Sequence, residues 1–261
     1  IFKKMSVKMM VKTNVKRFLL MFQFLTTIPL PLNLDAEDKD LGEGLIYAVP
    51  VGLVIGLILA AFNYLFALIF APLICAVLLN VVYIITTGGL HLDGFADTID
   101  GIFSYRTRER MLEIMKDSRL GSNAVIALIC ILLLNTALYY ETTNIKTSML
   151  ILMPVIGRMG IIIGAGISQY ARSNGGMGKA FTEYCGSKQI IISLIMCGTI
   201  FLAFGNYLSI AAGAISCVFS ICAAKYISKK LGGITGDVLG ALCEATQTFF
   251  MMVMYILSVV I

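Results

Sequence analysis

Charged residues are scarce in this chain. Only 13% of its 261 residues are Asp, Glu, Lys or Arg, whereas 59% are hydrophobic and the mean hydropathy is +0.91. About a quarter of the residues of soluble domains are charged, so this composition excludes an ordinary soluble fold and indicates a polytopic membrane protein. Because a helix needs roughly 20 residues to cross a membrane, the chain is long enough for one bundle of about seven helices. No second domain is expected.

The chain also lacks the usual patterns of zinc sites and disulfide frameworks. Its cysteines are odd in number (seven), none belongs to a C-x-x-C pair, and there is a single histidine. We interpret the cysteines as small packing residues. The net charge of +5 does not indicate a nucleic-acid partner, because Lys and Arg occur in separate clusters beside apolar segments, as in cytoplasmic loops of membrane proteins.

The N-terminal region begins with a basic arm, residues 1–17, which precedes a single integral membrane domain at residues 18–261. The apolar stretch FLLMFQFLTTIPLPL follows the arm, contains no A-x-A-like cleavage site and includes Pro29 and Pro31 near its end. About 15 apolar residues are too few for a span, and proline disfavours continued helix. An interfacial or re-entrant helix is therefore predicted here.

Apolar segments of crossing length predict an all-α transmembrane bundle with seven spans, at 44–70, 73–90, 121–140, 147–170, 189–205, 208–226 and 237–260. With a cytoplasmic N-terminus, nearly all Lys and Arg fall on inside segments, and Lys146 alone falls on an outside turn. This distribution predicts a multi-pass protein of the cell membrane whose polar motifs, and therefore its active site, face the cytosol. Two glycine pairs with small-xxx-small spacing predict close helix packing: Gly52 and Gly56, and Gly160 and Gly164.

An acidic stripe is predicted in the stretch GGLHLDGFADTIDG, residues 88–101. Asp93, Asp97 and Asp100 are spaced by four and three residues, so on a helix they share one face within roughly 60°. Carboxylates this close repel one another unless a cation binds between them. Ligands that are all oxygen favour Mg²⁺, with Mn²⁺ as a substitute, over zinc. We therefore predict a metal site at these three residues; the alternative is a solvated helix end.

His91 lies about 200° from Asp93 around the same helix, which makes it a poor ligand candidate. A hydrogen-bonded packing role is favoured over a catalytic one.

Basic and hydroxyl side chains surround the start of the next span. Lys116, Asp117, Ser118 and Arg119 precede Gly121, and a helix N-terminus beside such side chains suits a phosphate. The alternative is that the two cations only anchor the span at the membrane surface.

Two further sites are predicted to reach the same face. Arg158 lies inside the fourth span, where a charge is costly enough to indicate a functional role; a structural ion pair is the alternative. The segment LGGITGDVLGALCE places Gly233, Thr235 and Asp237 at the start of the last span, where a polyphosphate or ribose contact is plausible.

These motifs resemble one family. GGLHLDGFADTIDG, MLEIMKDSRLGSNAVIAL and GGITGDVLGA look like the hallmark segments of the cobalamin synthases, the adenosylcobinamide-GDP ribazoletransferases. The resemblance runs from TIPLP at 27–31 through the last span, and three long motifs in the correct order make it highly specific. Two features depart from the family pattern: Val238 replaces an expected Thr, and the basic arm is longer than usual.

The resemblance implies an integral membrane, Mg²⁺-dependent transferase. It would join adenosylcobinamide-GDP to α-ribazole, or to α-ribazole 5′-phosphate, and release GMP. Mg²⁺ would bind Asp93, Asp97 and Asp100, while Lys116, Arg119 and Arg158 would hold the diphosphate. The base that takes the hydroxyl proton is left open among Asp93, Asp97 and Asp117. Ser118, Gly233, Thr235 and Asp237 are the remaining candidates for substrate contact.

The expected partners are these two substrates and membrane lipid, with a homo-oligomer or association with other enzymes of the pathway left open. A CDP-alcohol phosphotransferase also uses helix-borne aspartates and Mg²⁺, but its pattern is D-G-x-x-A-R and this chain has D-G-F-A-D. A divalent cation transporter would place its acids near the bilayer centre rather than at one surface.

Overall fold

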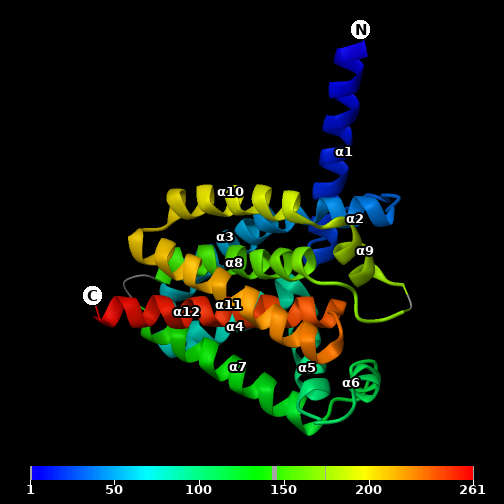
Figure 1. The fold of residues 1–261 in the computed structure, drawn as a ribbon. Coiled ribbons are helices and arrows are strands. Elements are labelled where there is room, and N and C mark those ends of the chain that lie inside the picture. The colour runs from blue at the N-terminus through cyan, green and yellow to red at the C-terminus, as the bar shows by residue number, and fades with distance from the viewer. Residues whose placement is uncertain (1, 143–145, 174, 261) are drawn as a thin grey trace.

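The computed structural model describes residues 2–142, 146–173 and 175–260, with side chains from residue 13 onward. The regular elements in this part of the chain are helical: α1 (Phe2–Leu25), α2 (Asp38–Gly44), the 3₁₀ helix η1 (Leu45–Tyr47), α3 (Ala48–Ala67), α4 (Pro72–Thr87), α5 (Leu90–Ile102), α6 (Arg108–Ile114), α7 (Ser122–Glu141), α8 (Lys146–Ile167), α9 (Met177–Tyr184), α10 (Ser187–Phe204), α11 (Tyr207–Leu231) and α12 (Gly236–Val260). The predicted all-α class is confirmed (Figure 1).

Six helical segments in this part of the chain are long and apolar enough to cross a membrane: the run Asp38–Ala67 and helices α7, α8, α10, α11 and α12. A seventh crossing is obtained if the bent pair α4 and α5 counts as one span. The bend between these two helices is 96°. α4 ends at Thr87 because Gly88 and Gly89 both adopt positive φ angles, 65° and 69°, which glycine reaches without strain. The predicted multi-pass bundle is therefore confirmed, with six to seven spans.

Helix α8 lies at the centre of the bundle, against α3, α10, α11 and α12. The predicted glycine contacts are confirmed. Gly52 and Gly56 of α3 lie directly against the α8 backbone at Pro154 and Ile151, with no room for a β-carbon. Gly160 and Gly164 of α8 lie against α12, where a β-carbon would meet the side chains of Thr246 and Leu242. These crossings let the backbones approach closely, as small residues do in membrane bundles.

Helix α1 runs without a break through residue 17, so the basic arm and the apolar stretch after it form one helix as far as Leu25. In Figure 1 it stands steeply across the direction of the spanning helices. Lys16 and Arg17 attach it to α2, with ion pairs to Asp40 of 2.6 and 3.1 Å, and Arg17 also pairs with Glu43 at 2.6 Å. The location of α1 at a membrane interface stays a prediction.

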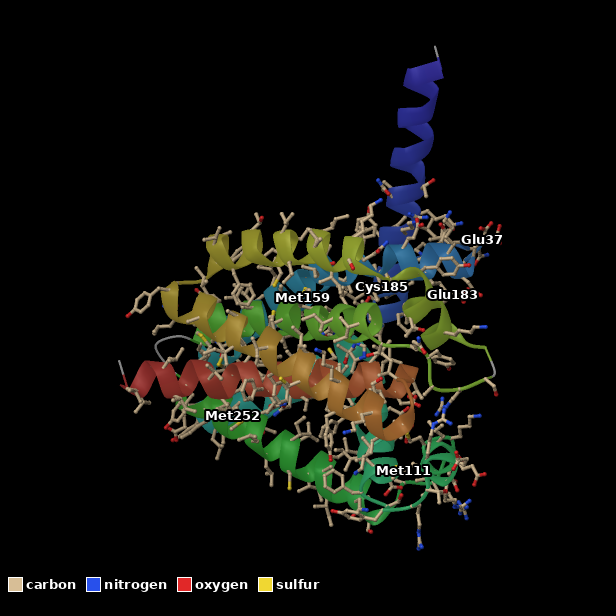
Figure 2. All side chains as sticks on the ribbon, in the orientation of Figure 1. Glu37, Met111, Met159, Glu183, Cys185 and Met252 are labelled. Atoms are coloured by element: carbon tan, nitrogen blue, oxygen red, sulfur yellow. The ribbon has the colours of Figure 1, made fainter. Side chains whose placement is uncertain are left out.

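The segments predicted to be cytoplasmic gather at one end of the bundle. α2, α5, α6 and α9 lie together at the right of Figure 1, and charged side chains concentrate there in Figure 2, where Glu37 and Glu183 are labelled. Carbon dominates the side chains along the rest of the bundle. The polar motifs therefore share one end of the molecule.

Candidate functional site

The acidic helix α5 crosses the start of α12 at unusually short range. A β-carbon on Gly94 would lie 2.7 Å from the Asp237 carbonyl oxygen, and one on Gly240 would lie 3.2 Å from Cα of His91. Only glycine at these two positions allows the backbones to approach so closely. The crossing places Asp93 and Asp97 next to Asp237, although 140 or so residues separate them in the chain.

The loop before α12 is fixed against the end of α8. The amide of Ile234 donates to the Gln169 carbonyl at 2.8 Å, and the amide of Ala171 donates to the Ile234 carbonyl at 2.9 Å. Gly233 has φ +143° and leaves no room for a β-carbon beside Gln169 and Ala171. This pairing positions the residue that follows, Arg172, beside α12.

Arg172 forms an ion pair with Asp237, its Nη2 lying 2.9 Å from Oδ2. The Thr235 hydroxyl donates to the same carboxylate oxygen at 3.1 Å and accepts from the amide of Val238 at 3.3 Å, as a helix cap does. Arg172 Nε is buried without a hydrogen-bond partner in the described structure. Gly233 and Thr235, predicted as substrate contacts, are thus buried in the framework that holds Asp237 and Arg172.

A cavity of about 310 Å³ opens at this crossing; we call it the acidic cavity. Its polar wall comprises His91, Asp93, Tyr170, Arg172 and Asp237. The opposite wall is apolar and is formed mainly by Phe24, Leu25, Leu45, Met177 and Phe181. A ligand with one charged and one apolar part matches this division.

The carboxylates at the cavity repel one another. α5 runs across the end of the bundle, 96° from α4, and carries Asp97 half-buried there. Burial, together with the nearby Asp93 and Asp237, raises the pKa of Asp97 to about 6 against the opposing effect of Arg172. A carboxyl group shifted in this way gains stability when a cation binds.

The third aspartate of the predicted stripe has a different partner. Asp100 Oδ2 accepts the backbone N–H of Gly121 at 3.2 Å, at the start of α7. Within residues 2–142, 146–173 and 175–260, no three His, Cys, Asp or Glu side chains are arranged to hold a metal ion. Mg²⁺, however, is commonly bound by one or two carboxylates together with substrate phosphates. The pair Asp93 and Asp97 beside a cavity fits that kind of donor set better than a preformed three-aspartate centre.

The segment after α6 places its side chains in two ways. Asp117 and Arg119 bind each other at the surface, with Nη2 to Oδ2 at 2.7 Å and Nε to Oδ1 at 3.0 Å, and this hydrogen bonding lowers the pKa of Asp117 to about 2. Lys116 instead lines a cleft of about 290 Å³ together with Arg108 and Arg172. Arg172 therefore borders both this cleft and the acidic cavity. Ser118 is exposed and, like Asp117 and Arg119, borders neither.

Arg158 lies deep in the bundle rather than at the cavity. It is fully buried, and its Nη1 donates to Gln247 Oε1 at 2.8 Å and to the Tyr83 hydroxyl at 3.5 Å. The Tyr83 hydroxyl also donates to Glu244 at 2.6 Å, and Gln247 Nε2 donates to Glu244 at 3.2 Å. We call Tyr83, Arg158, Glu244 and Gln247 the buried cluster. The structure does not bring Arg158 into the wall of the acidic cavity.

Arg172 was missed in the sequence analysis. It follows the fourth span directly, in the stretch QYARSNGG, and an arginine close to glycine at the boundary of a span is part of the pattern that singled out Arg119. His91 was given a packing role, yet it is 5% exposed, borders the acidic cavity and has no hydrogen-bond partner for Nε2 in the described structure.

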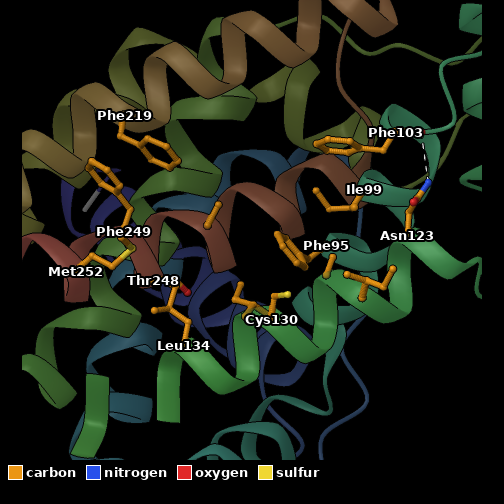
Figure 3. Close-up of a pocket in the computed structure, with 14 residues that line it drawn as sticks. Phe95, Ile99, Phe103, Asn123, Cys130, Leu134, Phe219, Thr248, Phe249 and Met252 are labelled. Atoms are coloured by element: carbon orange, nitrogen blue, oxygen red, sulfur yellow. Dashed lines mark hydrogen bonds between the residues drawn. The ribbon is translucent and has the colours of Figure 1, made fainter. Parts of the chain in front are cut away.

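A larger cavity of about 510 Å³ lies along α7, α11 and α12 and is shown in Figure 3. Its wall is apolar, with Phe95, Phe219 and Phe249 among its side chains, and the Asn123 amide binds the Phe103 carbonyl at 3.3 Å. It contains none of the predicted site residues and has no charged side chain for a phosphate.

Comparisons with known proteins identify the family of the chain. The model of a family described as cobalamin-5-phosphate synthase matches residues 17–255. Curated proteins named adenosylcobinamide-GDP ribazoletransferase are similar over nearly their full length: that of Acetivibrio thermocellus is 46% identical (93% of this chain and 98% of the relative), that of Clostridium acetobutylicum 44% (92% and 96%) and that of Alkaliphilus oremlandii 41% (95% and 100%). No solved structure matches the chain. On this similarity along nearly its whole length, the chain belongs to the cobalamin-5-phosphate synthase family.

Proposed function

We propose that this protein is an adenosylcobinamide-GDP ribazoletransferase that performs the final joining step of cobalamin biosynthesis. It joins adenosylcobinamide-GDP to α-ribazole or its 5′-phosphate and releases GMP. Family membership and the names of the relatives support the reaction. The observation that carries it is the meeting of Asp93 and Asp237 with Arg172 at one cavity, with Asp97 close to both of these carboxylates.

In this reaction a ribose hydroxyl oxygen forms a bond to the phosphorus on the cobinamide side of the diphosphate. The bond from that phosphorus to the bridging oxygen breaks, and GMP leaves with the oxygen. The hydroxyl proton passes to a carboxylate at the cavity. Positioning and electrostatic stabilisation account for most of the rate enhancement in phosphoryl transfer of this kind.

Asp93 and Asp97 are the residues that would hold Mg²⁺, because they present neighbouring carboxylates and the pKa of Asp97 is raised by burial and then by its acidic neighbours. When bound, the ion would supply positive charge to the diphosphate and to the leaving GMP. Arg172 would bind phosphate oxygens through the N–H groups that Asp237 does not occupy. Lys116 borders the adjoining cleft and adds a second cation.

The reaction is tested with purified protein in nanodiscs supplied with adenosylcobinamide-GDP and either acceptor. The expected result is one GMP released per joined product, with Mg²⁺ or Mn²⁺ and not after chelation. GMP release without a joined product, or activity with a CDP-alcohol instead, would contradict the proposed reaction. If the same purified protein, reconstituted in vesicles, transported a divalent cation across the membrane, the transporter alternative would be favoured.

For topology, we propose that the protein lies in the cell membrane with the acidic cavity and the N-terminus in the cytoplasm. The support is the concentration of Lys and Arg at the end that bears α5, α6 and α9. In a background without the exposed thiols Cys130 and Cys222, an impermeant reagent should label Ser118→Cys only from the cytoplasmic side and Tyr207→Cys only from outside. Labelling of both positions from one side would contradict this topology.

A further inference from the structure

The apolar wall of the acidic cavity has no role in the chemistry proposed above. It comes from four separate helical elements: Phe24 and Leu25 end α1, Leu45 begins η1, Leu90 begins α5, and Met177 and Phe181 lie on α9. The Phe24 and Phe181 rings are 5.5 Å apart between centroids and tilted by 54°. Aromatic side chains in this arrangement provide a surface against which a flat apolar ring can pack.

The size of the cavity limits which part of the substrates can enter. About 310 Å³ is at the lower end of the range for small-molecule sites. The corrin macrocycle of adenosylcobinamide is far larger than that volume and must remain outside. The candidates are then the guanine of the activated substrate and the base of the acceptor riboside.

Polarity separates these two bases. Guanine carries a carbonyl, an amino group and ring nitrogens, and each of these would lose a water hydrogen bond without gaining a partner beside Phe24, Leu25 and Leu45. The dimethylbenzimidazole of α-ribazole has no polar exocyclic group, so its apolar edge can be buried at little cost. A purine base in the acceptor would meet the same penalty as guanine.

We propose that the apolar part of the acidic cavity binds the base of the acceptor riboside, with Phe24 and Phe181 against the ring. The ribose then extends toward Asp93, where the transfer takes place. The acceptor specificity that follows is for flat bases without polar exocyclic groups. This inference rests on the proposed function.

The test measures binding of α-ribazole and of the α-riboside of adenine to the protein in nanodiscs by calorimetry, with and without GDP and Mg²⁺. We expect α-ribazole to bind at least tenfold more tightly than the adenine riboside, because the purine amino group would be buried without a partner. Equal affinities, or no detectable binding of α-ribazole under either condition, would overturn the inference.

Two variants test whether this part of the cavity is the binding site. Phe24→Ala and Phe181→Ala should each raise the acceptor dissociation constant roughly tenfold while the affinity for adenosylcobinamide-GDP stays within twofold. The matched control is Phe22→Ala: Phe22 lies on the same helix as Phe24 and is also half-buried, but it does not border the cavity. Unchanged acceptor affinity in both cavity variants, or a loss equal to that in Phe22→Ala, contradicts the site.

The same preparation distinguishes a wrong binding site for the base from a wrong proposed function. If GMP release is accompanied by joined product but the two ribosides bind equally well, the inferred binding site for the base is wrong and the proposed function stands. Tight binding of α-ribazole without any joined product contradicts the proposed function instead.

Discussion

The acidic cavity and the buried cluster each combine carboxylates with an arginine, but their surroundings differ. Arg172 and Asp237 border a cavity and leave polar atoms facing it, whereas Arg158 is fully buried and hydrogen-bonds to Gln247 and Tyr83. Arg158 lies within α8 and Arg172 follows that helix, so the cost of a charge near the membrane does not distinguish them. An arginine beside an open cavity can bind a ligand. Arg158 instead hydrogen-bonds to side chains of two other helices, and its Nε and Nη2 have no partner in the described structure.

The largest expected effect is at the cavity carboxylates. Asp93→Asn should lower the transfer rate by at least 10³-fold, because one charge that holds the cation is lost while the shape of the side chain is kept. Asp93 is exposed, so the melting temperature should stay close to that of the parent. Steady-state GMP release over a range of Mg²⁺ concentrations checks this. Activity restored fully at ordinary Mg²⁺ would remove Asp93 from the site.

The second-largest effect is expected at Arg172. Arg172→Met should lower kcat/KM for adenosylcobinamide-GDP by roughly 10²-fold, and Arg172→Lys should recover part of it, since lysine keeps the charge without the bidentate geometry. Arg119→Met is the matched control, an exposed arginine whose carboxylate partner is Asp117 rather than a cavity residue. Equal losses in the two methionine variants would end the distinction between a cavity arginine and a surface one.

The Arg158→Met variant tests the buried cluster in place of the acidic cavity. We expect the affinity for adenosylcobinamide-GDP to be retained and the stability to fall by about 3–5 kcal/mol, because Glu244 would be left in the bundle without a positive charge nearby. The double variant Arg158→Met/Glu244→Gln should recover much of that loss. Thermal unfolding in detergent and nucleotide-substrate binding are the two measurements. Loss of binding with unchanged melting temperature would return Arg158 to the phosphate site.

The pH dependence of stability tests the combined effect of burial and of the neighbouring Asp93 and Asp237 on Asp97. The pKa of Asp97 is raised to about 6 in the folded protein from an unfolded value near 3.8, so its ionisation opposes folding. The associated stability is fully present below pH 3.8 and is lost as pH rises through about 6. Without metal, the difference in melting temperature between the parent and Asp97→Asn should therefore widen from pH 5 to pH 7.5, in favour of the variant. Addition of Mg²⁺ at pH 7.5 should reduce this difference in melting temperature. A difference that does not change with pH would contradict the raised pKa assigned to Asp97.

The smallest effect is expected at Asp117, despite its place among the candidates for the catalytic base. Asp117→Asn removes an exposed ion pair with Arg119, and such pairs contribute about 1 kcal/mol or less. The transfer rate should change by less than about threefold. A loss near that of Asp93→Asn would show that Asp117 reaches the reacting atoms.

Sequence periodicity was sufficient for the fold class, the approximate spans and the close glycine contacts, because apolar runs and small-residue spacing are local patterns. It also identified Asp93, Asp97 and Asp237 as site candidates, and the structure brings these three together. It did not show that Asp100 caps α7, because the contact with Gly121 depends on how a loop returns to the helix. The depth of Arg158 in its span was visible, but its partners Tyr83 and Gln247 come from two other helices.

The bend between α4 and α5 also could not be predicted from apolar length alone. The run that was read as a span to residue 90 contains Gly88 and Gly89, and their positive φ angles turn the chain by 96° before the aspartates begin. Flexible residues at the end of a helix leave several paths open, and the packing of α5 on α12 selects one. That turn decides which side chains of residues 88–101 face the cavity.

The crossing at Gly94 and Gly240 limits which positions of this protein tolerate substitution, whether by design or during evolution. Many lipid-facing positions on α7 and α10 can exchange one apolar residue for another, because the bilayer accommodates different shapes. At Gly94 even one methyl group would meet the Asp237 backbone, so α5 and α12 would have to separate. A library of variants at the aspartates, with Gly94 and Gly240 kept, would preserve the helix crossing and could change which ions and phosphates bind. A library of variants at the two glycines would instead lose the register between α5 and α12 before any new chemistry could be selected.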